Sequence, residues 1–247
     1  MLVPMKPETP LLELRNISYS HPGSPDPLLS DINFKVSRER IGLIGPNGCG
    51  KTTLFHLIMG LLTPDTGEIL LEGKAVTTQK DIRSLRQKLG FLFQHSDDQL
   101  FSPTVLEDVA FGPLNLGFSP DAAREVSIQT LEQLGLKGFE DRITHRLSGG
   151  EKKLVALATI LAMKPQLLLL DEPSNNLDPA TRERLLEILR TLEPAHIIIS
   201  HDLDFLASSC TKLYSIHDGR MQRCRQKQVH SHEHIHPYGD HPHQHGT

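Results

Sequence analysis

The sequence contains few cysteines and no long apolar run. Its three cysteines, Cys49, Cys210 and Cys224, are too few for a disulfide framework, which favours a reducing compartment such as the cytoplasm. The longest apolar run, Leu154 to Met163, is shorter than the roughly 20 residues that a membrane-spanning helix needs. The start, MLVPMKPETP, has no apolar core, so we expect no secretory signal. If the protein acts at a membrane, it must bind another protein that is embedded there.

The chain also lacks a strong charge of either sign. Its formal net charge is -4 at pH 7, so no overall field attracts nucleic acid, and we expect no nucleic-acid partner. The 247 residues, 38% of them hydrophobic, suit one large globular domain or a domain with a subdomain. We expect an N-terminal extension over 1–10, a folded domain over 11–227 and a tail over 228–247.

One stretch, GPNGCGKTT, has the composition of a phosphate-binding loop. An apolar run precedes it and a helically spaced segment follows, which is the strand, loop and helix context that such a loop requires. Its glycines can adopt backbone conformations closed to other residues, so successive amides turn towards a phosphate, and the helix N-terminus adds partial positive charge. The residues expected to bind the nucleotide here are Gly45, Pro46, Asn47, Gly48, Cys49, Gly50, Lys51, Thr52 and Thr53.

Two side chains of this loop have specific expected roles. Lys51 can reach the β and γ phosphates, and the Thr52 hydroxyl can bind Mg²⁺. The alternative is a glycine-rich turn that binds nothing. The complete pattern in its proper context favours the binding of a nucleoside triphosphate.

Two carboxylates follow the apolar run LLLL, at the expected end of a buried strand. Ligands of open α/β sheets bind at that edge. We expect Asp171 to hold Mg²⁺, through water or directly, and Glu172 to polarise the attacking water. The alternative is a pair that caps the next helix. The phosphate-binding loop earlier in the chain favours the catalytic interpretation.

Gln94 and His201 each follow another predicted strand. A neutral imidazole at His201 can hydrogen-bond the γ-phosphate and the attacking water together. The amide of Gln94 can bind Mg²⁺ and sense the γ-phosphate. For each residue alone, a structural role is the alternative.

The motif RLSGGEKK predicts a second anion-binding helix start, formed by Ser148, Gly149 and Gly150. The chain already contains one phosphate-binding loop about 100 residues earlier, so the second site suits the nucleotide of another subunit. Two copies arranged head to tail would each offer LSGGE to the other's ATP. ATP would then hold the pair together, and hydrolysis would release it.

The alternation of strands and helices predicts an α/β fold with a mostly parallel sheet. We expect an antiparallel β subdomain as well, and an inserted helical subdomain over about 96–163. In the latter, Val105, Val109 and Phe111 are expected on one apolar face. Tyr19, expected just after the first strand, is either a base-stacking residue or an ordinary strand-edge aromatic.

Together these motifs resemble the ATP-binding subunit of an ABC transporter, a P-loop NTPase. The similarity covers about residues 11–225 and follows the family's order. It implies ATP and Mg²⁺ as cofactors, Tyr19 stacked on adenine, Glu172 as the catalytic base and His201 as the switch histidine. The chain departs from many relatives in the loop SNNLDP, which retains Asp178, and in LSGGEKK, which lacks the usual glutamine.

The stretch QHSDDQLFSPTVLEDVAFGP resembles the ATPases of energy-coupling-factor importers, especially the cobalt and nickel branch. The resemblance implies a peripheral protein on the cytoplasmic face of the membrane. Its implied partners are a second ATPase subunit in a homodimer, a transmembrane coupling subunit and a substrate-specific membrane subunit. The residues expected to line or flank the groove for coupling helices are Asp97, Asp98, Gln99, Leu100 and Phe101. The alternative is a surface loop with a buried Phe101.

The C-terminal tail is rich in histidine and poor in aliphatic residues, so we expect it to be disordered without a ligand. Imidazole suits nickel, cobalt, zinc and copper. A purification tag is the alternative, although tags are usually uninterrupted runs. The tail therefore favours nickel or cobalt as the transported ion. Its candidate metal ligands are His230, His232, His234, His236, His241, His243 and His245.

Other functions remain open at this point. An importer of this type for a vitamin or another substrate has the same motifs. A nickel-handling GTPase can pair a P-loop with a histidine-rich segment, but this chain has no Asn-Lys pair of a guanine-reading motif. A soluble ABC protein of translation or DNA repair would need a second domain or a long coiled-coil insertion. A pure metal store would leave Glu172 and His201 without a role.

Overall fold

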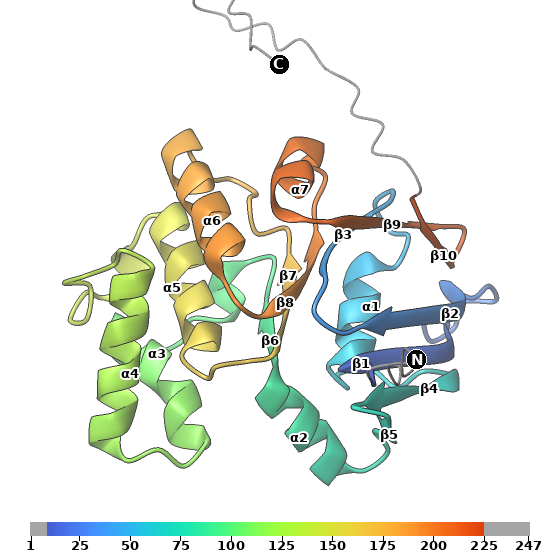
Figure 1. Cartoon of the computed structure of the whole chain (residues 1–247), viewed down its shortest axis with the longest axis horizontal. Coiled ribbons are helices and arrows are strands. Elements are labelled where there is room, and N and C mark those ends of the chain that lie inside the picture. Colours follow the sequence, from blue (N-terminus) through green and yellow to red (C-terminus); the bar gives the residue numbers. More distant parts are fainter. Residues whose placement is uncertain (1–8, 225–247) are drawn as a thin grey trace, which may run out of the picture.

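The computed structural model describes residues 9–224. Figure 1 shows two β-sheets, with helices packed around the longer one. The extension over 1–8 and the tail from 225 onward, including its histidines, lie outside the described residues. The expectations for these segments are therefore left as predictions.

A six-stranded sheet forms the centre of the fold, in the order β10-β9-β3-β8-β7-β6. Its strands pair in parallel from β9 to β6, and β10 is antiparallel at the edge. Strands β7 and β8 are buried along their whole length, as expected of parallel strands covered on both faces. The strands are β3 (Arg40–Ile44), β6 (Leu89–Leu92), β7 (Leu167–Asp171), β8 (Ala195–Ile199), β9 (Lys212–His217) and β10 (Arg220–Arg223).

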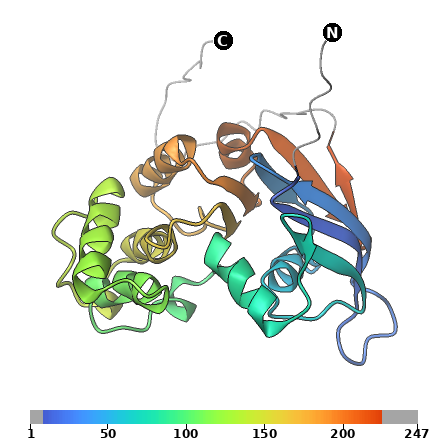
Figure 2. The ribbon, with the colours of Figure 1, turned by 60° about the horizontal axis from the view of Figure 1, so that its bottom comes forward.

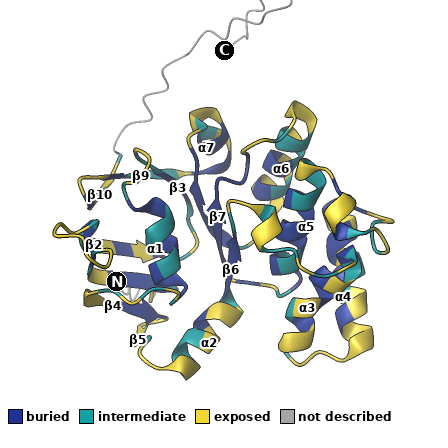
Figure 3. Ribbon diagram, turned by 180° about the vertical axis from the view of Figure 1, so that it is seen from behind, coloured by how far each residue is buried: buried dark blue, intermediate teal, exposed yellow. Residues whose placement is uncertain are grey.

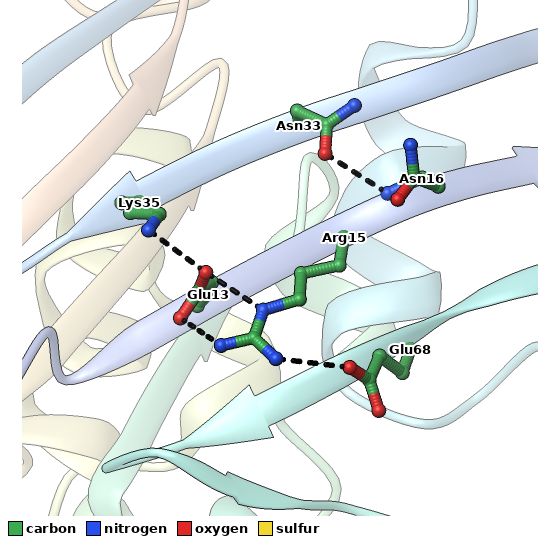
Figure 4. A network of polar contacts seen from close by, with 6 residues as sticks. All are labelled: Glu13, Arg15, Asn16, Asn33, Lys35 and Glu68. Atoms are coloured by element: carbon green, nitrogen blue, oxygen red, sulfur yellow. Dashed lines mark hydrogen bonds and ion pairs between the residues drawn. The ribbon is translucent and has the colours of Figure 1, made fainter.

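A smaller antiparallel sheet has the order β2-β1-β4-β5. Its strands are β1 (Leu12–Tyr19), β2 (Leu29–Val36), β4 (Thr66–Leu71) and β5 (Lys74–Ala75). A polar network crosses three of them (Figure 4): Glu13 accepts from Arg15 at 2.8 Å and pairs with Lys35 at 2.9 Å, while Arg15 also reaches Glu68. The two cations lower the pKa of Glu13 to about 2.

The helices begin at the capping residues that the sequence offers. Ser119 and Asp178, for example, each precede a proline and cap a helix, since each side chain accepts a hydrogen bond from the first turn. The α-helices are α1 (Lys51–Ile58), α2 (Gln79–Lys88), α3 (Val105–Asn115), α4 (Pro120–Gln133), α5 (Gly149–Leu161), α6 (Pro179–Thr191) and α7 (Leu203–Ser209). Two short 3-10 helices, η1 (Ser96–Asp98) and η2 (Thr144–Arg146), complete the segment that was expected to be mainly helical.

Two apolar cores lie on opposite faces of the parallel sheet, because successive strand side chains point to opposite faces. Leu167 and Leu169 of β7 belong to the core shared with α1 and the antiparallel sheet. Leu168 and Leu170 belong to the core shared with α3 to α7. Figures 1 and 2 show the two groups of elements on either side of the sheet, and Figure 3 shows the strands between them buried. The predicted α/β fold with its two accessory parts is thus observed.

Some local expectations were wrong. Tyr19 is the last residue of β1 rather than the residue after it, because the strand pairs with β2 up to the Tyr19–Leu29 position. Phe111 does not share the inner face of α3 with the fully buried Val105 and Val109, since 49% of its surface is exposed.

His196 is a fully buried histidine in the middle of the central sheet. Its Nε2–H donates to the carbonyl oxygen of Ser209 at 3.2 Å. Burial lowers the pKa of His196 to about 4, because the cation would lose its hydration. The unfolded chain, with a histidine pKa of about 6.5, therefore binds more protons than the folded chain between these two values.

We therefore predict that acid destabilises the fold through His196. Between pH 7.5 and 5 this residue should lower the free energy of unfolding by about 2 kcal/mol. Urea unfolding of the wild type and of His196→Leu at both pH values measures the effect: the leucine variant should lose less stability on acidification. An equal loss in both proteins would contradict the prediction.

Candidate nucleotide-binding and catalytic site

The candidate site lies where the parallel strands end. The register aligns these ends, since Leu43 of β3 and Asp171 of β7 both pair with Ile199 of β8. The loops that follow the strands enclose a cavity of about 460 Å³. Its lining residues are His21, Leu28, Asn47, Gly48, Gly50, Lys51, Thr52, Thr53, Gln94, Asp171, Glu172, Asn175, Ile199 and His201. The structure thus brings the glycine-rich loop, Gln94, the carboxylate pair and His201 to one cavity; the roles expected of them stay predictions.

The glycine-rich loop connects β3 directly to α1. Gly50 caps the helix with a φ of 99°, and a Cβ there would lie 2.8 Å from the Leu29 side chain. This position therefore requires glycine for both conformation and space. The buried ammonium of Lys51 donates to the carbonyl oxygens of Gly45 and Pro46 at 2.8 and 2.9 Å. The loop thus holds a cation beside backbone amides at a helix N-terminus, an arrangement suited to phosphate.

Thr52 and Asp171 place two side-chain oxygens next to each other in the lining of the cavity. The Thr52 hydroxyl donates to Oδ2 of Asp171 at 2.7 Å, which joins α1 to the end of β7. Burial raises the pKa of Asp171, while the hydrogen bond from Thr52 opposes this shift. Mg²⁺ prefers hard oxygen ligands and usually binds one or two carboxylates together with substrate phosphates. This donor set fits Mg²⁺.

Glu172 occupies a strained position with a φ of 46°. It is 4% exposed, and burial raises its pKa. Its Oε1 lies 3.4 Å from Nε2 of the half-exposed His201, whereas Oε2 is buried with no hydrogen-bond partner in residues 9–224. Glu172 lines the cavity, and a carboxylate in this position can accept a proton from a bound water.

Gln94 lines the cavity, and its backbone is held from the other side by α5. The ammonium of Lys153 donates to the Gln94 carbonyl oxygen at 2.7 Å. The side chain of Gln99 accepts from the Phe93 amide at 3.2 Å and donates to the carbonyl oxygen of Ala156 at 2.8 Å. Sequence reasoning missed these two anchors; a lysine directly before the apolar run Leu154 to Met163 was the signal available.

Tyr19 is 7% exposed at the end of β1. Its ring meets His21 edge-on, with 5.4 Å between the ring centroids. His21 lines the cavity, whereas Tyr19 lies behind His21 and does not line it. The expected stacking of Tyr19 on a base is left as a prediction.

The LSGGE segment forms the start of α5 but does not line the cavity described above. Ser148 and Glu151 form a capping box: the Ser148 hydroxyl accepts from the Glu151 amide, and the Glu151 carboxylate accepts from the Ser148 amide. A Cβ built on Gly149 meets no atom within 4 Å. Packing within residues 9–224 therefore does not explain a glycine here.

A groove of about 920 Å³ lies beside the Gln94 segment, bordered by α2, α3 and α5. Two aromatic side chains project at its edge: Phe101 is 66% exposed and Phe111 is 49% exposed. Their rings pack edge-on, with 4.9 Å between the ring centroids. The alternative of a buried Phe101 is therefore wrong. Asp98, Gln99 and Phe101 line the groove, as the sequence predicted for that loop.

Other features of residues 9–224 add no second site. A larger cavity of about 1330 Å³ lies at the opposite ends of the strands and is lined by residues that precede β7 and β8, including Gln166 and Pro194. Within this range no cluster of three or more His, Cys, Asp or Glu side chains could hold a metal ion. No helix in it has the length and apolar character needed to cross a membrane.

Comparison with known proteins identifies the family. The ABC transporter family model matches residues 29–175. An ABC transporter ATP-binding protein of Nitratidesulfovibrio vulgaris is 53% identical over 96% of this chain and 86% of its own length. The energy-coupling factor transporter ATP-binding protein EcfA of Methanothermobacter thermautotrophicus is 47% identical over 85% of this chain and 69% of its own length.

Solved structures agree. CbiO1 of Clostridium perfringens, described as part of the ABC transporter complex CbiONQ, superposes with a TM-score of 0.78 and 35% identity, covering 87% of this chain and 88% of that one. A dimeric bacterial ABC transporter cassette superposes with a TM-score of 0.76 and 25% identity over 87% of this chain and 99% of that chain. This chain belongs to the ABC transporter ATP-binding family. It is an ABC ATPase, an enzyme that couples ATP hydrolysis to transport.

Proposed function

We propose that this chain is the ATPase subunit of an energy-coupling-factor importer, peripheral to the cytoplasmic face of the membrane. The observation that carries the proposal is the separation of the LSGGE helix start from the chain's own nucleotide cavity. Gly149 has open space in front of it, and its amide lies in the first turn of α5. In a head-to-tail homodimer this turn of one copy meets the triphosphate held by its partner.

Within each composite site the residues have separate roles. Amides of the glycine-rich loop and Lys51 bind the β and γ phosphates. Thr52, Asp171 and Gln94 hold Mg²⁺, which neutralises phosphate charge when bound. Glu172 accepts a proton from the attacking water, and His201, whose Nε2 lies 3.4 Å from Oε1 of Glu172, orients that water and the γ-phosphate.

Residues of both copies complete each nucleotide-binding site. Ser148, Gly149 and Gly150 of the other copy bind the γ-phosphate. Tyr19 stacks on adenine, and this role is supported by its contact with His21, which lines the cavity. The remaining loop residues Gly45, Pro46, Asn47, Gly48, Cys49, Gly50 and Thr53 enclose the phosphates. Closure of two copies on two ATP molecules then moves the membrane partner, and hydrolysis resets it.

The groove beside Gln94 receives a helix of the transmembrane coupling subunit. Phe101 and Phe111 in the groove expose apolar surface to water, and a partner helix that covered them would remove this surface from water. Asp98 and Asp108 line the groove together with Arg83 and Arg86, and Asp97 beside it is paired with Lys152, so the groove presents charges of both signs around its apolar surface. The EcfA relative and the CbiO1 structure, both named for membrane transporter complexes, support this partner class.

Nickel or cobalt is the transported ion that we propose, selected by a separate membrane subunit. The support is the alternate-histidine tail, which carries imidazole ligands suited to either ion, or to Zn²⁺. A vitamin or another substrate is the second candidate, because none of the described site residues discriminates among cargoes. Family membership does not favour the nickel-handling GTPase.

Replacing Glu172 with Gln should slow ATP hydrolysis by at least about 100-fold, because the amide cannot accept the water's proton. The variant should still bind ATP and accumulate as an ATP-bound dimer. Steady-state phosphate release and size-exclusion chromatography with ATP·Mg measure the two effects. Normal turnover by this variant would show that another residue is the base.

Gly149→Ala in the Glu172→Gln background tests whether the first turn of α5 meets the nucleotide of the other copy. The added methyl group meets nothing inside the described chain, and alanine favours a helix, so the melting temperature should not fall. If a partner's nucleotide approaches this turn, the dimer should weaken sharply. A full-strength ATP-dependent dimer in the double variant would contradict the head-to-tail arrangement.

Replacing both Phe101 and Phe111 with serine should weaken binding of the transmembrane coupling subunit roughly 20-fold or more, because complete burial of such a side chain contributes about 1.5–3 kcal/mol and 66% and 49% of the two surfaces remain to be buried. Co-purification from membranes that contain the co-expressed coupling subunit measures the loss. Leu203→Ser, which removes an exposed apolar side chain on α7 outside the groove, should retain the partner. If the wild type, the Phe101/Phe111 double variant and Leu203→Ser all retained the coupling subunit equally, the subunit would bind outside the groove.

Deleting residues 228–247 should spare ATP hydrolysis and reduce the nickel bound per chain, because the imidazole ligands are removed while the folded domain remains. Isothermal titration with NiCl₂ and a phosphate-release assay measure the two properties. Nickel and cobalt uptake by cells that produce the complete transporter, with and without the tail, tests the cargo. Uptake of neither ion would favour the second candidate.

A further inference from the structure

Lys153 is a buried lysine outside the set of residues that the proposed function uses. It lies on the inner side of α5, one turn after the Ser148 cap, and only 5% of its surface is exposed. Its ammonium donates to two backbone carbonyl oxygens of the segment after β6: Gln94 at 2.7 Å and Phe93 at 3.4 Å. Asp171 and Glu172 are near enough to oppose the lowering of the Lys153 pKa by burial, but neither is within ion-pair distance.

Such a residue is costly if it serves packing alone. Burial of an ammonium without a paired carboxylate is unfavourable, and a methionine of similar length would fill the same space at lower cost. The favourable features of this position are the two hydrogen bonds. They connect α5 to the backbone of the residue that lines the nucleotide cavity, Gln94.

Gln99 makes a second connection between the same two elements. Its amide donates to Ala156 O at 2.8 Å and to Thr159 Oγ1 at 2.9 Å on α5, while its oxygen accepts from the Phe93 amide. Strand β6 ends at Leu92, so both anchors hold the chain just after it leaves the sheet. The groove loop with Phe101 follows directly. Helix α5 therefore has the anion-binding turn at its start and holds the Gln94 segment along its side.

We propose that Lys153 is a positioning residue that makes the Gln94 segment move with α5, so that a nucleotide bound at the Ser148 turn is sensed at the groove for the membrane partner. This inference rests on the proposed function, in which that nucleotide belongs to a second copy. When the Ser148 turn closes on the partner's triphosphate, the rigid helix carries the Lys153 ammonium with it. The carbonyl of Gln94 follows, and with it the loop that bears Phe101.

Hydrogen–deuterium exchange of the full chain in the Glu172→Gln background tests this proposal. Adding ATP·Mg should slow amide exchange about tenfold both in 147–152, the start of α5, and in 93–101, the groove segment. In Lys153→Met the start of α5 should respond as before, while the response of 93–101 should shrink to less than about threefold. Lys153→Arg retains a cationic donor and should restore at least part of the response.

Lys137→Met is the matched control, because it removes a lysine whose side chain is 83% exposed; both segments should respond fully. A full response of 93–101 in Lys153→Met, or no recovery in Lys153→Arg, would overturn the proposal. If Lys153→Met loses its thermal transition, Gln99→Met replaces it, since it removes the second anchor and should uncouple the segments in the same way; a full response there would overturn the proposal. A missing response at the start of α5 in Glu172→Gln alone would contradict the dimer itself, and this inference with it.

Discussion

Parallel pairing of β3, β8, β7 and β6 is the constraint on which the site depends. Because the strands run in the same direction, the segments that follow them emerge at one edge of the sheet. The glycine-rich loop, Gln94, Glu172 and His201 lie far apart in the sequence but line one cavity there. The hydrogen bond from Thr52 to Asp171 then joins α1 directly to the end of β7. The rest of the fold keeps these strand ends in register.

The Ser148 turn at the start of α5 does not line the nucleotide cavity of its own chain. In the head-to-tail homodimer that we propose, this turn of one copy completes the cavity of the other, so catalysis would depend on the association of two copies. The open space at Gly149 and the strained Glu172 fit that dependence, since neither serves the stability of the isolated chain.

Helix α5 connects the separate parts of the molecule. Its apolar residues, from Leu154 to Ile160, pack in the core beneath the parallel sheet. Its polar residues Lys153 and Thr159 bind the segment after β6, and its first turn lies at the surface of the chain. A single rigid element thus contacts the sheet, the Gln94 segment and the exterior. In physical terms, that is what a motor subunit needs to convert nucleotide binding into movement of a groove.

The sequence by itself determined the class of fold and selected the candidate site residues, several of which the structure brings to one cavity. Local patterns carry that information: glycine spacing around Lys51, an apolar run ending at Asp171, and the capping residue Ser148 each depend on neighbouring residues alone. Only the tertiary structure decided that Phe111 is exposed, that Tyr19 ends β1, and that Lys153 holds Gln94. These features depend on contacts between residues distant in the chain, and helical or strand periodicity does not specify which distant surface a side chain meets.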